Sequence, residues 1–341
     1  MLRRLRRPAA LAAPLLLLTS LAAGCGESTT VESEASDRLD AVEIAGEVGS
    51  SPEVTWKNQM RADDAESEVI TEGDGVAVDD GGTVFVNYWV GNGFTEDTVL
   101  DTYKGGDGEG EGAGAVPITV GGEVPAPQTQ NPTEAEIARY LLDSFVGSQV
   151  EPGDTAGTRK AVTVNASEVV GFGGGGLNIG NLDALLVVID LTSVPLSAPE
   201  GTQVKRPPFA PSIVLKKKLP GSLDFSSTPE PTGELRVGTL VKGEGEAVES
   251  GDTIVVNYLG QVYNGKEPFD ESYSRGTPLT TVIGAGSVID GWDQGLVGVP
   301  VGSRVLLVIP PDLGYGAEGN PGAGIKGTDT LYFVIDVLGA A

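Results

Sequence analysis

The sequence predicts an α+β protein of two similar domains, each a twisted antiparallel β-sheet wrapped on one short α-helix. Three observations lead to this fold class. The length of 341 residues suits two domains. The 50 glycines and 22 prolines favour short strands joined by many turns. Finally, one set of segments occurs twice in the chain in the same order, which indicates two copies of one domain.

The clearest repeat is the hexapeptide Thr-Val-Phe-Val-Asn-Tyr at 83–88, which returns 170 positions later as Thr-Ile-Val-Val-Asn-Tyr at 253–258. Four further pairs of segments keep the same order: 52–57 with 211–216, 99–103 with 268–273, 137–147 with 288–298, and 185–191 with 331–337. The offsets differ, so we infer that loops were inserted and deleted between the strands of the two copies.

Alternating and continuous apolar runs bounded by Gly and Pro predict the strands. They lie at 84–90, 161–166, 185–191, 254–262, 304–309 and 331–338. Each copy also contains one segment suited to a short helix, near 137–146 and near 288–297. We expect Asp290 to cap the start of the second helix and Gly298 to end it.

The N-terminus reads as an export signal. Four arginines precede an apolar stretch at 9–23 that is too short for a bilayer span. The following Leu-Ala-Ala-Gly-Cys resembles the processing site of a bacterial lipoprotein, with ordinary cleavage elsewhere as the alternative. This resemblance implies lipidation of Cys25, the only cysteine, and an extracytoplasmic protein anchored to the cell membrane. The predicted segments are a signal peptide at 1–24, a flexible acidic tether at 25–46, the first domain at 47–197, a linker at 198–210 and the second domain at 211–341.

The charge and the missing histidine exclude several classes of function. The formal net charge is −26, which disfavours nucleic acid and anionic headgroups as partners. An acidic coat that keeps the protein soluble explains this charge equally well. No histidine is present, so triads, metal sites and proton shuttles built on histidine are excluded. We expect neither a metal nor a cofactor.

The last ninety residues hold a series of separated aromatic and polar residues. They are Tyr258, Phe269, Asp270, Arg275, the segment 288–292 with Trp292, the Gly-Tyr-Gly at 314–316, and the Leu-Tyr-Phe at 331–333. In this order the series resembles the pocket of the FKBP-type peptidyl-prolyl cis-trans isomerases. The resemblance covers residues 211–341 and implies an isomerase that acts on proline-containing unfolded or exported polypeptides. Macrocyclic FKBP inhibitors are further possible ligands.

The resemblance also implies roles for individual residues. The Trp292 indole forms the floor beneath the proline ring, while the Ile289 N–H and the Tyr315 hydroxyl each hold a substrate carbonyl. Asp270 lies at the pocket edge, where Tyr258 and Arg275 are available to bond its carboxylate. The predicted catalytic set is Tyr258, Phe269, Asp270, Ile289, Trp292, Tyr315 and Phe333, and the predicted substrate contacts are Arg275, Leu279, Val288 and Ile325. Leu279, Ser287, Asn320 and the 323–326 tip depart from the common family pattern and are expected to alter the rim.

Such a pocket needs no nucleophile. Rotation about a peptide bond faces a barrier of ~18–20 kcal/mol because the nitrogen shares its lone pair with the carbonyl. Twisting the bond removes charge separation, so a dry apolar pocket favours the twisted state over the planar one. A thousandfold acceleration requires only ~4 kcal/mol.

The first copy has lost most of this series. The matching places Leu141 opposite Trp292 and retains Tyr88 and Asp101, with no arginine at the right distance after Asp101. The other replacements are Leu100 for Phe269, Phe172 for Tyr315 and Val187 for Phe333. Our hypothesis is that residues 47–197 keep the fold without isomerase activity.

Two other functions remain open at this stage. The chain could be a non-catalytic, chaperone-like lipoprotein that only binds proline-containing segments. A solute-binding lipoprotein of a transporter would suit the N-terminus, but such proteins need larger α/β lobes than the low predicted helix content allows.

Overall fold

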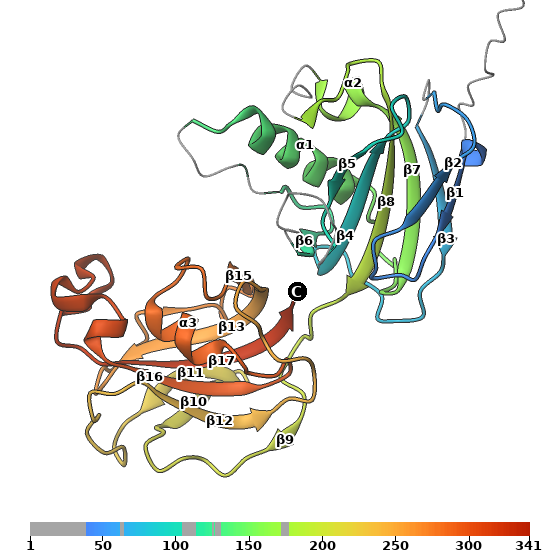
Figure 1. Cartoon of the computed structure of the whole chain (residues 1–341). Helices are drawn as coiled ribbons and strands as arrows, with labels where there is room; N and C mark the ends of the chain where they lie inside the picture. The colour runs from blue at the N-terminus through green and yellow to red at the C-terminus, as the bar shows by residue number, and fades with distance from the viewer. Residues whose placement is uncertain (1–38, 62–64, 104–113, 125, 127–130, 172–176) are drawn as a thin grey trace, which may run out of the picture. The chain divides into compact units, whose positions relative to one another are not determined.

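The computed structural model describes residues 39–61, 65–103, 114–124, 126, 131–171 and 177–341 (Figure 1). The signal peptide, Cys25, most of the predicted tether and Phe172 lie outside these residues. The described chain contains two large antiparallel sheets, each accompanied by a helix and a separate two-stranded hairpin. Among the described residues, no helix is both long and apolar enough to span a membrane.

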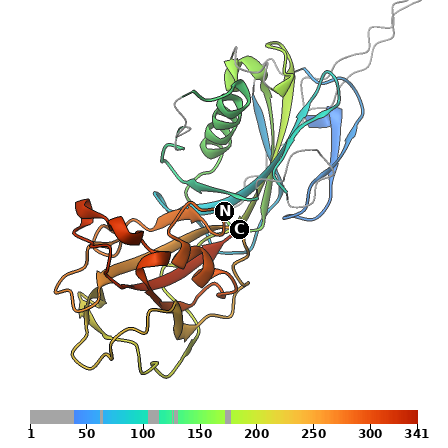
Figure 2. The ribbon, with the colours of Figure 1, turned by 60° about the vertical axis from the view of Figure 1, so that its left-hand side comes forward.

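The first sheet has six strands, with β4 at its centre. One face carries α1 and the opposite face carries the hairpin β1–β2, as Figure 2 shows. The strand order is β3 (Glu66–Thr71), β7 (Thr158–Asn165), β8 (Ala184–Ser193), β4 (Thr83–Asn92) and β5 (Thr98–Asp101), and β6 (Val116–Thr119) also pairs with β4. The remaining elements are the 3-10 turn Leu39–Ala41, β1 (Val42–Ala45), β2 (Glu53–Trp56), α1 (Glu134–Ser148) and α2 (Ala166–Val169).

The second sheet has seven strands and the same layers, with α3 on one face and the hairpin β10–β11 on the other. The strand order is β14 (Asp270–Glu271), β13 (Thr253–Val262), β17 (Leu331–Ala340), β16 (Arg304–Ile309), β12 (Arg236–Lys242) and β9 (Thr202–Gln203), and β15 (Leu279–Val282) also pairs with β13. The other elements are β10 (Ser212–Lys216), β11 (Leu219–Asp224), α3 (Asp290–Leu296) and 3-10 turns at Pro311–Leu313, Gly316–Glu318 and Pro321–Ala323. Strand β9 falls within the predicted linker.

The central strands of each sheet are buried on both faces, and the residues of a strand alternate between these faces. On β8, Val187 and Ile189 belong to the apolar cluster under α1, whereas Leu186 and Val188 belong to the cluster under the hairpin. We call these two sides the helix face and the hairpin face. Because neither face meets water, the central strands read as continuous apolar runs.

The predicted strands are all present, and their ends differ from the prediction by at most three residues. The first helix is longer than expected, because a capping box between Thr133 and Glu136 begins it earlier. The predicted cap Asp290 is wrong: it is the first helical residue, and Ile289, with an extended backbone, precedes it without a side-chain cap. Gly298 adopts a positive φ of 84° just beyond the helix end, as expected.

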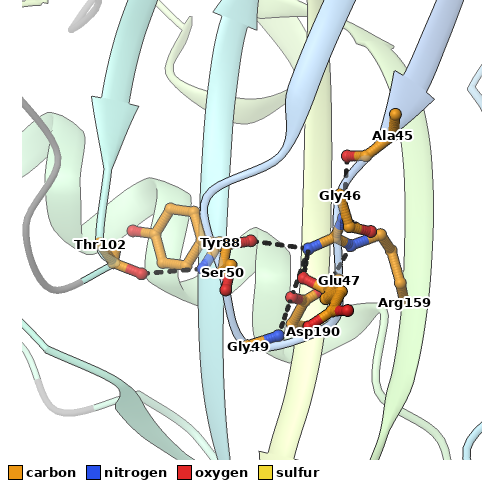
Figure 3. A network of polar contacts seen from close by, with 9 residues as sticks. All are labelled: Ala45, Gly46, Glu47, Gly49, Ser50, Tyr88, Thr102, Arg159 and Asp190. Carbon is orange, nitrogen blue, oxygen red and sulfur yellow. Dashed lines mark hydrogen bonds and ion pairs between the residues drawn. The ribbon is translucent and has the colours of Figure 1, made fainter.

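A buried ion pair fixes residues 45–50, at the connection between β1 and β2, to the first sheet (Figure 3). The Arg159 guanidinium donates to Asp190 at 2.6 and 2.7 Å, and both side chains are at most 1% exposed. Its remaining N–H groups donate to the carbonyls of Ala45, Gly46, Glu47 and Ser50, and Asp190 also accepts from the Gly49 N–H. Every donor of this buried cation is therefore satisfied, which offsets its desolvation.

We expect Arg159→Met to destabilise the protein strongly. The change leaves Asp190 buried without a counter-ion, and loss of one partner of a buried pair typically costs about 3–5 kcal/mol. Denaturant unfolding of the full chain measures the loss, and amide hydrogen exchange at residues 45–50 shows whether this segment detaches.

Arg304→Met is the matched control. Arg304 makes the equivalent bonds to Asp336 on the second sheet, at 2.6 and 2.7 Å, but its side chain is 22% exposed. Its loss should be smaller, and unchanged exchange at residues 45–50 in Arg159→Met would contradict the role given to that arginine.

Candidate active site

A cavity of about 860 Å³ opens on the helix face of the second sheet, a size typical of ligand pockets. The lining comes from strands β13, β14, β15 and β17, helix α3 and the loops around them. The lining residues are Tyr258, Phe269, Asp270, Leu279, Ser287, Val288, Ile289, Asp290, Trp292, Gly314, Tyr315, Asn320, Gly322, Ala323 and Phe333.

The cavity contains a cluster of four aromatic rings centred on Trp292. The indole, 3% exposed, packs edge-to-face with Tyr258 and Phe333 at centroid distances of 5.5 and 5.3 Å. Phe333 packs in the same way against Phe269 at 5.5 Å. Edge-to-face contacts are favourable between aromatic rings and restrict their orientation. The cavity therefore has a rigid apolar base.

Two glycines make room for these rings. A Cβ atom on Gly260 would lie 2.6 Å from ring atoms of both Phe269 and Phe333. On Gly291 it would lie 2.5 Å from the Ile309 side chain. Since real Cβ atoms do not approach so closely, Gly260 permits the ring pair and Gly291 permits α3 to pack closely on β16.

A polar triad closes one edge of the cavity. The Tyr258 hydroxyl donates to Asp270, and Arg275 donates to the Asp270 carboxylate at 2.8 Å and to the Tyr258 oxygen at 3.2 Å. Burial opposes ionisation of Asp270, but the hydrogen bonds from Tyr258 and Arg275 outweigh it and hold the pKa of Asp270 below its ordinary value. Burial, reinforced by the bond to Asp270, raises the pKa of Tyr258.

Within residues 177–341, the donors at the cavity that have no partner include the Ile289 N–H, the hydroxyl of the exposed Tyr315 and the indole N–H of the buried Trp292. The loop before Ile289 is fixed to helix α3, because Asp293 of this helix accepts hydrogen bonds from the Gly284 and Gly286 N–H groups at 2.8 and 2.9 Å. The site therefore offers an apolar base with available donors, among them the Ile289 N–H and the Tyr315 hydroxyl, an arrangement that can hold a peptide by its carbonyls.

The structure brings together nine of the eleven residues predicted for this site. Arg275 does not line the cavity and acts on it through Asp270. Ile325 lies in the core at 3% exposure, because its backbone pairs with Asn320 and turns this part of the loop inward. The lining also includes three residues expected at the rim, Ser287, Asn320 and Ala323, and three to which sequence matching gave no role in the site, Asp290, Gly314 and Gly322.

The first sheet has a different arrangement on its helix face. The Tyr88 hydroxyl donates to Asp143 of α1 at 2.5 Å, Arg139 donates to the same carboxylate at 2.9 Å, and the Arg139 guanidinium lies 5.3 Å from the Tyr88 ring centroid. Burial raises the pKa of Tyr88 well above its ordinary value. A tyrosine, an aspartate and an arginine thus meet here too, but two of them come from the helix.

The retained role predicted for Asp101 is wrong. In the strand pairing, Asp101 opposes Trp89 as Glu271 opposes Leu259, so Leu100 stands where Asp270 stands. A shift of one residue moves a side chain to the other face of a sheet. Asp101 therefore bonds Ser51 at 2.6 Å on the hairpin side and makes no contact with Tyr88.

The match of Leu141 with Trp292 is shifted in the same way. Leu142 and Val146 are the buried residues of α1 at the spacing that Trp292 and Leu296 have on α3, and Leu141 is only half-buried. The helix residue that corresponds to Trp292 is therefore Leu142.

Comparison with known proteins identifies the family. A family model described as FKBP-type peptidyl-prolyl cis-trans isomerase matches residues 244–338. An FK506-binding protein of Streptomyces anulatus is 43% identical over 109 residues, which cover 32% of this chain and 88% of that protein. The isomerase FkpA of Escherichia coli is 47% identical over 96 residues, 28% of this chain and 34% of that protein. The crystal structure of AtFKBP13 covers 32% of this chain and 95% of its own at 40% identity, with a TM-score of 0.29.

The chain belongs to the FKBP family of peptidyl-prolyl cis-trans isomerases, because its match spans most of the Streptomyces relative. The isomerase domain lies in its C-terminal region.

We expect Asp270→Asn to lower the free energy of unfolding at neutral pH by less than about 1 kcal/mol, because the ion pair is half exposed. The pKa of Asp270 is depressed in the folded state, so its contribution is present above the ordinary value of about 4 and is lost as the pH falls through the folded value. Unfolding curves of parent and variant should converge in acid. A difference that grows with falling pH would contradict this assignment.

Proposed function

We propose that residues 211–341 isomerise X–Pro bonds of exported polypeptides in the cavity above Trp292. The ring cluster around this indole carries the proposal, since it offers a flat, dry, preformed surface for a proline ring. The family membership supports the activity, and the unpartnered Ile289 N–H and Tyr315 hydroxyl support the mode of binding.

In this mechanism the proline ring packs on Trp292 between Tyr258 and Phe333. The Ile289 N–H and the Tyr315 hydroxyl hold substrate carbonyls, which fixes the peptide on both sides of the rotating bond. Loss of water around the amide disfavours its planar, charge-separated form and so lowers the barrier to rotation. No proton is transferred.

The triad of Tyr258, Asp270 and Arg275 positions one wall. Its hydrogen bonds satisfy a partly buried carboxylate and hold the Tyr258 ring edge-on to the indole. Arg275 thus serves substrate binding by fixing Asp270 and Tyr258, while Leu279 and Val288 line the remainder of the cavity.

Trp292→Leu in the full chain should lower kcat/KM for a proline tetrapeptide by about tenfold or more, which corresponds to ~1.4 kcal/mol of lost transition-state stabilisation. The leucine removes the flat base and two edge-to-face contacts. A protease-free cis–trans exchange assay measures the rate.

Trp292→Phe is the conservative variant and should retain more activity, and circular dichroism reports folding of both. An unchanged rate in Trp292→Leu would overturn the proposed site. Binding of the peptide by the parent without any acceleration would favour the non-catalytic alternative.

We further propose that residues 47–197 are a degenerate FKBP-like domain without isomerase activity, joined by the linker 198–210. The support is local and specific. A Cβ atom on Gly73 would lie 2.2 Å from the Ala156 carbonyl oxygen, and on Gly243, 170 positions later, 2.1 Å from that of Val301. Such close backbone approaches at matched positions favour a common fold, while the Tyr88–Asp143 bond occupies the hydroxyl on the helix face.

The location and partners are also proposals. The sequence 21–25 supports lipidation of Cys25. The folded part begins earlier than the predicted tether boundary, because Leu39–Ala41 form a 3-10 turn and Val42–Ala45 form β1. We therefore propose residues 25–38 as the tether that keeps the folded parts outside the cytoplasm and near the membrane. Its substrates would be proline-containing exported chains. Because the Streptomyces relative is named for FK506 binding, a macrocycle of that class is a proposed ligand of the same cavity.

Intact-mass analysis of the protein purified from bacterial membranes tests the anchor. We expect residue 25 to be the N-terminus with a diacylglycerol-sized or larger mass increase, and Cys25→Ser to release the protein from the membrane fraction. Membrane association that survives Cys25→Ser would contradict lipid anchoring at this residue.

A further inference from the structure

The hairpin face of the first sheet contains a cleft of about 540 Å³ that the proposed isomerase function does not use. Two of the three tryptophans of the chain line it, Trp56 from β2 and Trp89 from β4. The other lining residues are Ser51, Pro52, Val54, Glu96, Thr98 and Asp101.

The cleft is built around a glycine. A Cβ atom on Gly91 would lie 2.2 Å from Trp89 Cη2 and 3.0 Å from Trp56 Cζ2, so both indoles lie against the bare backbone of β4. Trp89 is 6% exposed and Trp56 is half-buried. The indoles are therefore held in place, with Trp56 presenting most of the accessible aromatic surface and Trp89 lying beneath it.

The second sheet fills the matched position with a side chain. Gln261, 170 residues after Gly91, is fully buried and bonds the N–H and carbonyl of Leu223 on β11 at 2.8 and 3.0 Å. The rings of Phe225, Tyr263 and Tyr332 pack together on this face. One sheet thus ties its hairpin down with a glutamine, while the other has a glycine and a cleft.

The charged groups of the cleft are acidic, since neither lysine nor arginine is among its lining residues. Asp101 accepts from the Ser51 hydroxyl and the Tyr103 N–H, and its two oxygens retain further acceptor capacity. Glu96 lies in a turn in which its N–H donates to the Asn92 carbonyl at 2.8 Å. Its backbone adopts a φ of 64°, an unfavourable conformation for glutamate. This turn places an exposed carboxylate at the rim of the cleft, where it can meet a ligand.

The electrostatic field of this half favours a cationic ligand. Residues 47–197 contain 25 acidic and 6 basic residues, whereas residues 211–341 contain 16 and 9. Of the six basic residues, Arg139, Arg159 and Lys160 are bound in ion pairs that are at most a quarter exposed. Such a field attracts cationic segments and repels acidic ones.

We propose that this cleft binds an arginine or lysine side chain of an extended polypeptide. The cationic head would meet Glu96 and Asp101, and the aliphatic stem would lie on the indoles, where cation–π attraction adds to apolar contact. The first half then holds basic segments of client chains, a function separate from proline isomerisation and independent of it.

The probe is a capped dodecapeptide of alternating Arg and Ser, compared with one in which Gln replaces each Arg. With the full chain, we expect calorimetric binding of the Arg peptide only. Trp56→Leu should weaken it about tenfold and Glu96→Asn about threefold to fivefold, in line with a partly exposed cation–π contact and one ion pair. Asparagine tolerates the positive φ, so the second variant keeps the fold.

Glu68→Gln is the matched control, since Glu68 is an exposed acid of β3 outside the cleft. It should change the affinity less than about twofold, as expected for a screened surface charge. Equal losses of affinity in Glu68→Gln and Glu96→Asn would show that the overall negative charge, and not this cleft, attracts the peptide, and would overturn the site. Equal binding of the Gln peptide, or no binding of the Arg peptide, would overturn it as well.

The indole N–H resonances locate the ligand directly, because the chain has three tryptophans. The Arg peptide should shift the signals of Trp56 and Trp89 and leave that of Trp292 in place. Isomerase activity on a neutral proline tetrapeptide should be unchanged in Trp56→Leu and Glu96→Asn, and Trp292→Leu should still bind the Arg peptide. A failure of the proposed isomerase activity and a failure of the proposed peptide binding can thus be detected separately.

Discussion

Burial of the central strands on both faces of each sheet is the constraint on which the rest of the structure depends. Along a central strand, one residue meets the helix and the next meets the hairpin. On β13, Tyr258 faces the helix side and belongs to the aromatic cavity, while Leu259 packs under the hairpin. On β4, Tyr88 and Trp89 divide in the same way. Each sheet therefore offers two separate surfaces whose chemistry is set by alternate positions.

The same constraint explains how much of the fold the sequence could predict. The strands follow directly from apolar runs and their bounding turns, and β16 at 304–309 agrees with the prediction at both ends. The register of short strands is harder to predict from the sequence, because β5 and β14 are brief and the loops beside them differ in length. An aspartate matched by identity, Asp101, belongs to the hairpin side, and only the strand pairing reveals it. When two strands are matched, a shared residue type is therefore weaker evidence for equivalent positions than the face of the sheet on which each residue lies.

The candidate site was predictable where its residues lie on regular elements. Tyr258, Trp292 and Phe333 come from β13, α3 and β17, whose spacing fixes their direction. The 314–325 loop has no such period, and the inward turn of Ile325 follows from a backbone pairing with Asn320. The carboxylate that bonds Tyr88 was not predictable either, because Asp143 lies on a helix far from it in sequence.

The two tyrosines show how one physical requirement can have opposite consequences for a pocket. A largely buried phenol hydroxyl needs a partner, and here each finds an aspartate backed by an arginine. For Tyr258 the partners come from the short edge strand β14 and the turn after it, so the space beside α3 remains open above Trp292. For Tyr88 both come from α1 itself, and the guanidinium lies across the ring. The difference between an open and an occupied site thus depends on which element supplies the carboxylate, and on the single position at which Leu100 replaced an acid.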